Sequence, residues 1–269
     1  MDDARSRFDA WARQRHRELA SHDRLAASAV KNMTVLAYAF GTETYLTDEF
    51  WRVELAYLQT FATNGWMPGI LVCNRATARM REFCARQGID LQVEPSLVPG
   101  DIDSMSRDCL ARLGERFTTD YVLIVQNDGF PMRGGIAEFV AQGYDYIGAP
   151  FVRWISCLDW YPYRYNVGNG GFSLRSRRLC QDVGRIYRRW FCRWPFWPRI
   201  FGDDNFYCRF LRCFWPGFNR RFRFAPPEVA GRFSIEHNDD FRPSDGPPLG
   251  FHGVAGWERW WQEGGKERP

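Results

Sequence analysis

Tyr121-Val-Leu-Ile-Val125 runs directly into Gln126-Asn-Asp-Gly129, and this stretch decides the fold class. Five consecutive apolar residues suit a strand that is covered on both faces, as in a mostly parallel sheet. In an open α/β sheet, ligands bind beyond the carboxyl ends of the strands. The polar residues after Val125 therefore become candidates for ligand contact, although Asp128-Gly129 on its own is more typical of a simple turn.

Short strands and helices alternate on both sides of this stretch. We expect further strands at 34–40, 69–73, 144–149 and 171–174, and helices at 48–61, 77–87, 104–117, 134–142 and 206–214. This alternation predicts an α/β fold with a central, mostly parallel sheet flanked by helices. The charged, Ala-rich residues 1–30 are expected to form a helical preface, and residues 31–269 a single domain.

The composition excludes several classes of protein. The chain has 269 residues, 45% of them hydrophobic and 25% charged, so it can bury a sizeable core and is not of the disordered or fibrous type. We find no transmembrane segment and no apolar signal region, and we expect a cytoplasmic protein, at most peripheral at the inner face of the membrane. The eight cysteines have no CxxC and no Cys/His ligand spacing, which argues against a zinc module.

Two acidic motifs have different interpretations. Asp101-Ile-Asp103 follows Pro99-Gly100 rather than a strand and precedes a helical segment, so we interpret it as a helix N-cap and not as a metal site. Gly202-Asp-Asp-Asn205 opens another helical segment. Its carboxylates can stabilise the start of that helix, or one of them can face a cleft and accept the proton of an attacking hydroxyl.

Two glycine-rich segments lie in the second half of the chain, Val167-Gly-Asn-Gly-Gly-Phe-Ser-Leu-Arg175 and Pro248-Leu-Gly-Phe-His-Gly253. Three glycines within four residues allow a backbone to approach a ligand closely, although a tight turn would need them equally. The spacing matches neither a dinucleotide-binding fingerprint nor a P-loop. His252 is one of four histidines, and a lone histidine is more often structural than a ligand.

Taken together and in this order, the motifs resemble the pattern of GT-A-fold, nucleotide-sugar-dependent glycosyltransferases: a strand-end D-x-D, a Gly-rich loop, an acidic pair and a C-terminal His. More closely, the sequence resembles a family of uncharacterised bacterial and fungal GT-A-like domains. The resemblance spans roughly residues 32–256. The matching segments are Val122–Asp128, Tyr144–Pro150, Val167–Arg175, Pro227–Glu236 and Gly250–Gly253.

The resemblance implies a GT-A (Rossmann-like) fold and a divalent cation on the donor diphosphate. Asp128 matches the last Asp of the D-x-D, the position that coordinates the metal, and His252 matches the His that completes the metal shell. The first Asp is replaced by Gln126, an uncharged and weaker ligand, which makes metal dependence an open question. An imidazole ligand favours Mn²⁺ somewhat over Mg²⁺.

The resemblance also implies the residues that would bind the donor. Gly170 and Gly171, in the loop Gly168–Gly171, would lie against the donor sugar or the acceptor. Asn127 would lie beside the bound nucleotide, together with Gln126 and Asp128. Thr42 and Glu43, just past the first strand, occupy the place where the fold receives the nucleoside.

The implied activity is transfer of a sugar from a nucleotide-sugar donor to a hydroxyl of a glycan or lipid-linked acceptor. Asp204 matches the catalytic base of inverting members of the fold, and Asp203 occupies the usual Glu position beside it. The alternative is a non-catalytic nucleotide- or sugar-binding module on the same fold, since a fold does not by itself imply activity.

A basic aromatic stretch, Arg185–Phe201, lies outside the motif set and contains five Arg, seven aromatic residues and no acid. Its aromatic rings can complete the core while the Arg side chains reach solvent. It can also contact a membrane surface, or offer aromatic faces to an acceptor sugar. Nucleic-acid binding uses the same residue types. One such patch on a chain of net charge +4 is weak evidence for nucleic-acid binding, and we expect no nucleic-acid partner.

Overall fold

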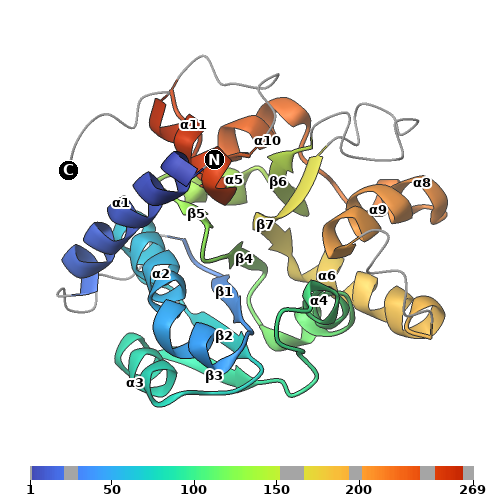
Figure 1. Ribbon diagram of the computed structural model, residues 1–269. Helices are drawn as coiled ribbons and strands as arrows, with labels where there is room; N and C mark the ends of the chain where they lie inside the picture. The colour runs from blue at the N-terminus through green and yellow to red at the C-terminus, as the bar shows by residue number, and fades with distance from the viewer. Residues whose placement is uncertain (1, 21–29, 152–166, 194–201, 237–245, 263–269) are drawn as a thin grey trace.

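The computed structural model describes residues 2–20, 30–151, 167–193, 202–236 and 246–262, and its centre is a six-stranded sheet in the order β3-β2-β1-β4-β7-β6 (Figure 1). Strands β1 to β4 pair in parallel, whereas β7 runs antiparallel to both of its neighbours. The sheet is therefore mixed and mostly parallel, which confirms the predicted fold class. Its strands are β1 Met33–Ala39, β2 Gly69–Cys73, β3 Ile89–Val93, β4 Tyr121–Val125, β6 Tyr146–Pro150 and β7 Val167–Ser176.

Both faces of the central strands are buried, as the continuous apolar runs predict. In β1, Val35 and Ala37 belong to the core that includes α2 and α3, whereas Leu36 and Tyr38 belong to the core that includes α4 and α6. This alternation follows from the two-residue period of a strand. The covering helices are α2 Trp51–Asn64, α3 Ala78–Gln87, α4 Ile102–Arg116 and α6 Arg177–Ile186.

Helix ends follow the residues that the sequence offers for capping. Thr77 accepts a hydrogen bond from the Met80 N–H at the start of α3, and Gly88 ends that helix in the left-handed conformation. Asp101 caps α4 by accepting from the Asp103 N–H at 3.0 Å, so the N-cap interpretation of this Asp-x-Asp is confirmed.

A second, three-stranded sheet in the order β5-β9-β8 connects distant parts of the chain. Its strands are β5 Gly129–Pro131, β8 Ser234–Ile235 and β9 Gly250–His252. β5 starts four residues after β4 ends, and β9 pairs with it antiparallel so that Gly129 lies opposite His252. The C-terminal part of the chain is thereby brought to the end of β4.

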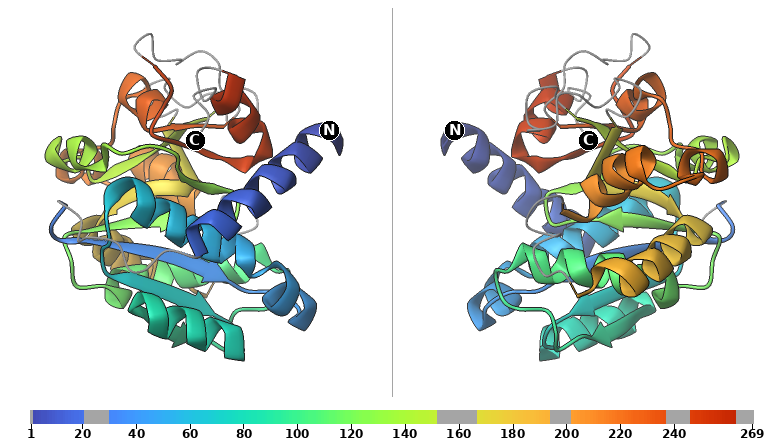
Figure 2. Two further views of the ribbon diagram at one scale, coloured as in Figure 1. Left: turned by 90° about the vertical axis from the view of Figure 1, so that its left-hand side faces the viewer. Right: turned by 90° about the vertical axis from the view of Figure 1, so that its right-hand side faces the viewer.

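Helix α1, Asp2–Ala20, covers the outside of the molecule beside α2 and α11, Gly253–Gln262 (Figure 2). Phe8 and Leu19 are buried, and the Trp11 ring stacks near Phe130 with ring centroids 6.4 Å apart. Residues 21–29 of the expected preface lie outside the described part of the chain. None of the described helices has the length and apolar character needed to cross a bilayer.

The remaining elements are short: one lies between β1 and α2 in the chain, one lies between β5 and β6, and the others follow α6. They are η1 Tyr45–Glu49, α5 Ile136–Ala141, η3 Tyr187–Phe191, η4 Phe206–Leu211, α8 Arg212–Phe214, α9 Phe218–Arg221 and α10 Pro227–Phe233, where η denotes a π-helical segment.

The expected loop at Gly168–Gly171 is wrong, because these residues lie within β7. The pairing of β7 with β6 shifts register on both sides of Ala149, so the glycine segment is an irregular strand rather than a turn. A Cβ at Gly148, on the neighbouring strand, would lie 2.2 Å from the Asn169 carbonyl oxygen, and this close approach needs a glycine.

Candidate active site

The turn after β4 presents Asp128 at the carboxyl edge of the sheet. The backbone groups of Gln126 and Gly129 bond to each other in both directions, at 2.8 and 3.1 Å, which closes a tight turn around Asn127 and Asp128. The Asn127 amide donates to the Tyr45 hydroxyl at 3.2 Å. Asp128-Gly129 thus forms the turn that its sequence suggests, and the same turn can also contact a ligand.

His252, at the end of β9, reaches the same turn from the C-terminal part of the chain. Its Nδ1 hydrogen-bonds to the Glu236 carboxylate at 3.0 Å, its Nε2 lies 3.1 Å from the Gln126 amide oxygen, and Nε2 is 4.0 Å from Asp128 Oδ1. Burial lowers the pKa of His252, but the hydrogen bond and charge of Glu236 and the charges of Asp128 and Asp204 outweigh it, so the net pKa is raised.

Two glycines, Gly171 in β7 and Gly129 in β5, provide room for this imidazole. A Cβ at Gly171 would lie 1.9 Å from His252 Nε2, and one at Gly129 would lie 2.8 Å from His252 Cδ2. The ring thus lies directly against two backbone segments that cannot carry a side chain. The glycine motif and the C-terminal His, far apart in sequence, form one structural unit.

Asp204 lies on the other side of the same β7 segment. Its Oδ2 accepts from the Gly170 N–H at 3.1 Å, and its Oδ1 accepts from the Asn205 N–H at 2.6 Å. Burial raises the pKa of Asp204 to about 7, with a further contribution from the charge of Asp203. The two backbone N–H groups and the charge of Arg175 act in the opposite direction.

Asp203 has a different environment, because its carboxylate is paired with a buried cation. Arg175 is 1% exposed, and its guanidinium donates to Asp203 Oδ2 at 2.9 Å and to the Gly170 carbonyl at 3.2 Å. The Cys109 thiol also lies 3.2 Å from Asp203 Oδ2, and the Tyr207 ring centroid lies 5.1 Å from the guanidinium. Arg175 therefore joins the acidic pair to β7.

Two adjoining cavities, of about 490 and 220 Å³, open at this edge of the sheet and share Tyr38 and Gln126 in their walls. The larger is also lined by Thr42, Asn127 and Asp128. The smaller is lined, among others, by Asn169, Gly170, Gly171, Arg175, Asp203, Asp204 and His252.

The two cavities bring together all but one of the site residues expected from the sequence. Glu43 lines neither of them: its side chain is 70% exposed and pairs with Arg75 at 3.3 Å. Sequence reasoning missed Tyr38 and Arg175. Tyr38 is the second-to-last residue of a buried strand, and Arg175 is a charge that directly follows Phe172-Ser-Leu174, which the sequence predicts as a strand; both signals were present in the sequence.

The donor set fits a divalent cation in part. A carboxylate oxygen, an imidazole nitrogen and an amide oxygen converge from Asp128, His252 and Gln126, and these are donors that Mn²⁺ accepts. The Glu236 carboxylate on Nδ1 is the usual second partner of a metal-binding histidine. Within the described ranges, however, no three His, Cys, Asp or Glu side chains form a group that could hold a metal ion. A cation would therefore also need donor atoms from a molecule bound in the cleft.

The mostly parallel six-stranded sheet and the helices that flank it have the GT-A fold of glycosyltransferases. The galactosyltransferase LgtC, solved with donor and acceptor sugar analogs, matches with a TM-score of 0.52 over 88% of this chain and 98% of that chain, at 14% identity. Core-mannan synthase A (CmsA/Ktr4) from Aspergillus fumigatus, in its Mn/GDP form, matches with a TM-score of 0.49 over 71% of this chain and 73% of that chain, at 9% identity. No curated protein matches the sequence.

Within this fold, the chain belongs to the family described as protein of unknown function DUF5672, which matches residues 104–252. The match begins in α4 and ends at His252. It includes the turn after β4, the glycine segment of β7 and the acidic pair.

Proposed function

We propose that this protein is a nucleotide-sugar-dependent glycosyltransferase that transfers a sugar, with inversion, to a hydroxyl of a glycan or lipid-linked acceptor. One observation carries the proposal: Asp128, His252 and Asp204 border two adjoining cavities at the carboxyl edge of β1 and β4. That edge is where open α/β sheets bind their ligands. The fold likeness to LgtC is consistent with it but does not define the substrate.

The larger cavity would receive the nucleoside diphosphate. Thr42 and Asn127 lie in its wall, and Asp128 lies towards the smaller cavity, beside His252. Asp128 and His252 would hold Mn²⁺ or Mg²⁺, with Gln126 as a neutral third donor. When bound, the cation would stabilise the negative charge that develops on the leaving diphosphate. The imidazole must be unprotonated to bind a metal, and its pKa is raised. Cation binding should therefore become stronger as the pH rises through that pKa.

The smaller cavity would receive the transferred sugar and the acceptor hydroxyl. Asp204 lines it, held by the N–H groups of Gly170 and Asn205, so its carboxylate has a fixed orientation. A carboxylate with a pKa of about 7 is a stronger base than an ordinary aspartate and is still largely ionised above neutral pH. Asp204 would accept the acceptor proton as the new bond forms. Asp203, engaged by Arg175, would position the pair rather than transfer a proton.

A non-catalytic nucleotide- or sugar-binding module is the second candidate. Gln126 stands where a metal-binding carboxylate would be expected, and its amide is already in contact with His252. Such a module would bind a nucleotide without depending on a cation, and it would not cleave the donor.

The test combines nucleotide binding with donor hydrolysis. We expect one nucleoside diphosphate, in a panel of uridine, guanosine, cytidine and thymidine diphosphates, to raise the Tm more with Mn²⁺ than without it. Asp128→Asn should abolish the Mn²⁺-dependent part, whereas Asp120→Asn, which removes an exposed carboxylate outside both cavities, should not. A Tm shift that is the same with and without Mn²⁺, with no hydrolysis of the matching nucleotide sugars, would favour the binding module.

Asp204→Asn tests the base and the stereochemistry separately from binding. The variant should keep the Mn²⁺-dependent Tm shift and lose most of the transfer, a reduction of about 10²-fold or more for a missing general base. The anomeric configuration of the product, read by NMR, should be opposite to that of the donor. Retention of configuration, or transfer at the wild-type rate by Asp204→Asn, would remove Asp204 from the role of base.

A further inference from the structure

A surface on the side of the molecule beyond α6 combines exposed aromatic rings with arginines. Trp190 in η3 is 56% exposed and Phe214 in α8 is 51% exposed; they are the only aromatic side chains among the large apolar ones exposed in the described chain. The ring of Trp190 lies 6.3 Å from that of Trp215, which joins η3 to the end of α8. We call the surface formed by Arg189, Trp190, Arg193, Phe214 and Trp215 the basic aromatic surface. Residues 194–201, the second half of the stretch Arg185–Phe201, lie outside the described part of the chain.

The core does not account for this surface. Beneath it, Tyr187, Phe206 and Phe218 are nearly inaccessible and fill the core of this part of the fold. Phe191 packs on Phe206 with ring centroids 5.2 Å apart. The aromatic side chains that complete the core are thus different residues from the exposed pair, and the surface is supported by a packed interior.

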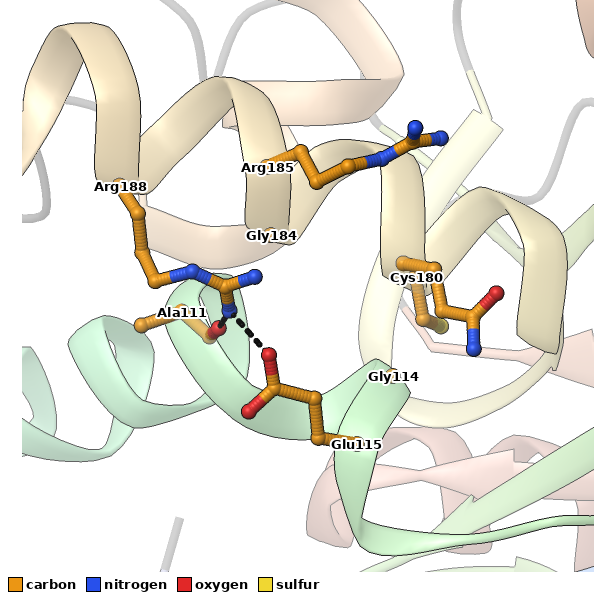
Figure 3. A pocket seen from close by; sticks show the side chains of 8 residues that line it. Ala111, Gly114, Glu115, Cys180, Gly184, Arg185 and Arg188 are labelled. Carbon is orange, nitrogen blue, oxygen red and sulfur yellow. Dashed lines mark hydrogen bonds and ion pairs between the residues drawn. The ribbon is translucent and has the colours of Figure 1, made fainter.

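Positive charge is concentrated in the same part of the chain. The described segments 183–193 and 205–227 hold nine arginines and no acid, whereas the whole chain has a net charge of +4, so the remainder is net negative. Some of these arginines have structural roles: Arg188 bonds to Glu115 and to the Ala111 carbonyl, which fastens η3 to α4 beside a cavity of about 350 Å³ (Figure 3).

Arg189 and Arg193, by contrast, are exposed and make no ion pair within the described ranges. Arg189 lies over the Trp190 ring, 5.4 Å from its centroid. The exposed Trp190 ring therefore lies beside a positive charge that no carboxylate of the described chain neutralises.

We propose that the basic aromatic surface docks on an anionic lipid bilayer. Tryptophan prefers the boundary between headgroups and acyl chains, and arginine is attracted to anionic headgroups, so both parts of the surface match the same partner. A single-stranded nucleic acid would need open ring faces for base stacking. One face of Trp190 carries the Arg189 guanidinium, and the rings of Trp190 and Trp215 are tilted by 59°, which favours the bilayer.

The test is co-sedimentation of the full chain with vesicles at low ionic strength. We expect binding to vesicles of equimolar phosphatidylglycerol and phosphatidylcholine, none to phosphatidylcholine alone, and release at high salt. Arg189→Gln/Arg193→Gln should lower the partition coefficient about tenfold or more, from the loss of two juxtamembrane charges. Trp190→Ala/Phe214→Ala should lower it by a similar factor while leaving the salt dependence unchanged.

Arg17→Gln/Arg86→Gln is the matched control, because it removes two exposed arginines from α1 and α3, away from this surface. It should bind like the unmodified chain, and circular dichroism should show all variants folded. The proposal is overturned if the unmodified chain does not bind anionic vesicles, if the control loses as much binding as the surface variants, or if oligo-dT binds more tightly than the vesicles. None of these results depends on glycosyl transfer, so the proposed function is tested separately.

Discussion

Asp204→Asn should change the pH dependence of stability, and the expected size can be worked out from the site. The carboxyl is held by the Gly170 and Asn205 N–H groups and is close to the Asp203 charge. In the unfolded chain an aspartate ionises near its ordinary pKa of about 4. In the folded protein its pKa is about 7. Between these values the folded state binds a proton that the unfolded state does not, so stability falls as the pH rises.

The magnitude follows from the width of that window. From about pH 5 to about pH 7, each unit costs the wild type about 1.36 kcal/mol, or about 2.7 kcal/mol in all. Asp204 lines a cavity and is partly solvated, so we expect about 2 kcal/mol. The asparagine amide can accept only one of the two backbone hydrogen bonds, which costs about 1–3 kcal/mol at every pH and cancels when the two pH values are compared.

The measurement is urea unfolding of wild type and Asp204→Asn at about pH 5 and about pH 8, chosen to bracket the folded-state pKa. The free energy of unfolding of the wild type should fall by about 2 kcal/mol more than that of the variant. Ser106→Ala changes the wall of the same cavity without removing a charge and should follow the wild type. Parallel pH dependences in wild type and Asp204→Asn would refute the assignment of a raised pKa to this carboxyl.

Three further predictions concern the scaffold of the site, each measured by urea unfolding. Gly171→Ala should destabilise by about 2 kcal/mol or more and abolish Mn²⁺-dependent nucleotide binding, because its Cβ would overlap the His252 ring; wild-type binding would contradict this. Arg175→Met leaves the Asp203 carboxylate buried and unpaired and should cost about 3–5 kcal/mol, partly recovered in Arg175→Met/Asp203→Asn; a double variant no more stable than the single one would refute the pairing. Thr77→Ala removes the cap of α3 and should cost about 1 kcal/mol with binding unchanged.

The order of the helices and strands was predictable because local patterns encode it. The apolar run Tyr121–Val125 requires burial on both faces, and Thr77 and Gly88 mark the two ends of α3. The glycines after Val167 misled the prediction. Glycine signals only that backbone or a side chain comes close, and here a neighbouring strand and the His252 ring take that space.

The site was predictable where a motif residue follows directly from a strand, as Asp128 does. The pairing of Arg175 with Asp203 was not, since it joins residues 28 positions apart and depends on how β7 lies against the start of the helical segment at Gly202. The exposed position of Glu43 was equally hidden. Glu43 pairs with Arg75, which lies two residues past the end of β2, and no local pattern shows a contact between residues 32 positions apart.

The pairing of β9 with β5 has a consequence for folding during synthesis on the ribosome. Strands β1 to β4 and the turn that carries Asp128 emerge long before Gly250–His252 are synthesised. A nascent chain can therefore form four of the six strands of the main sheet before the histidine of the site has been synthesised. Translation that stops early leaves a partly folded product with no complete cleft, and only the last strand to be made gives the site its histidine.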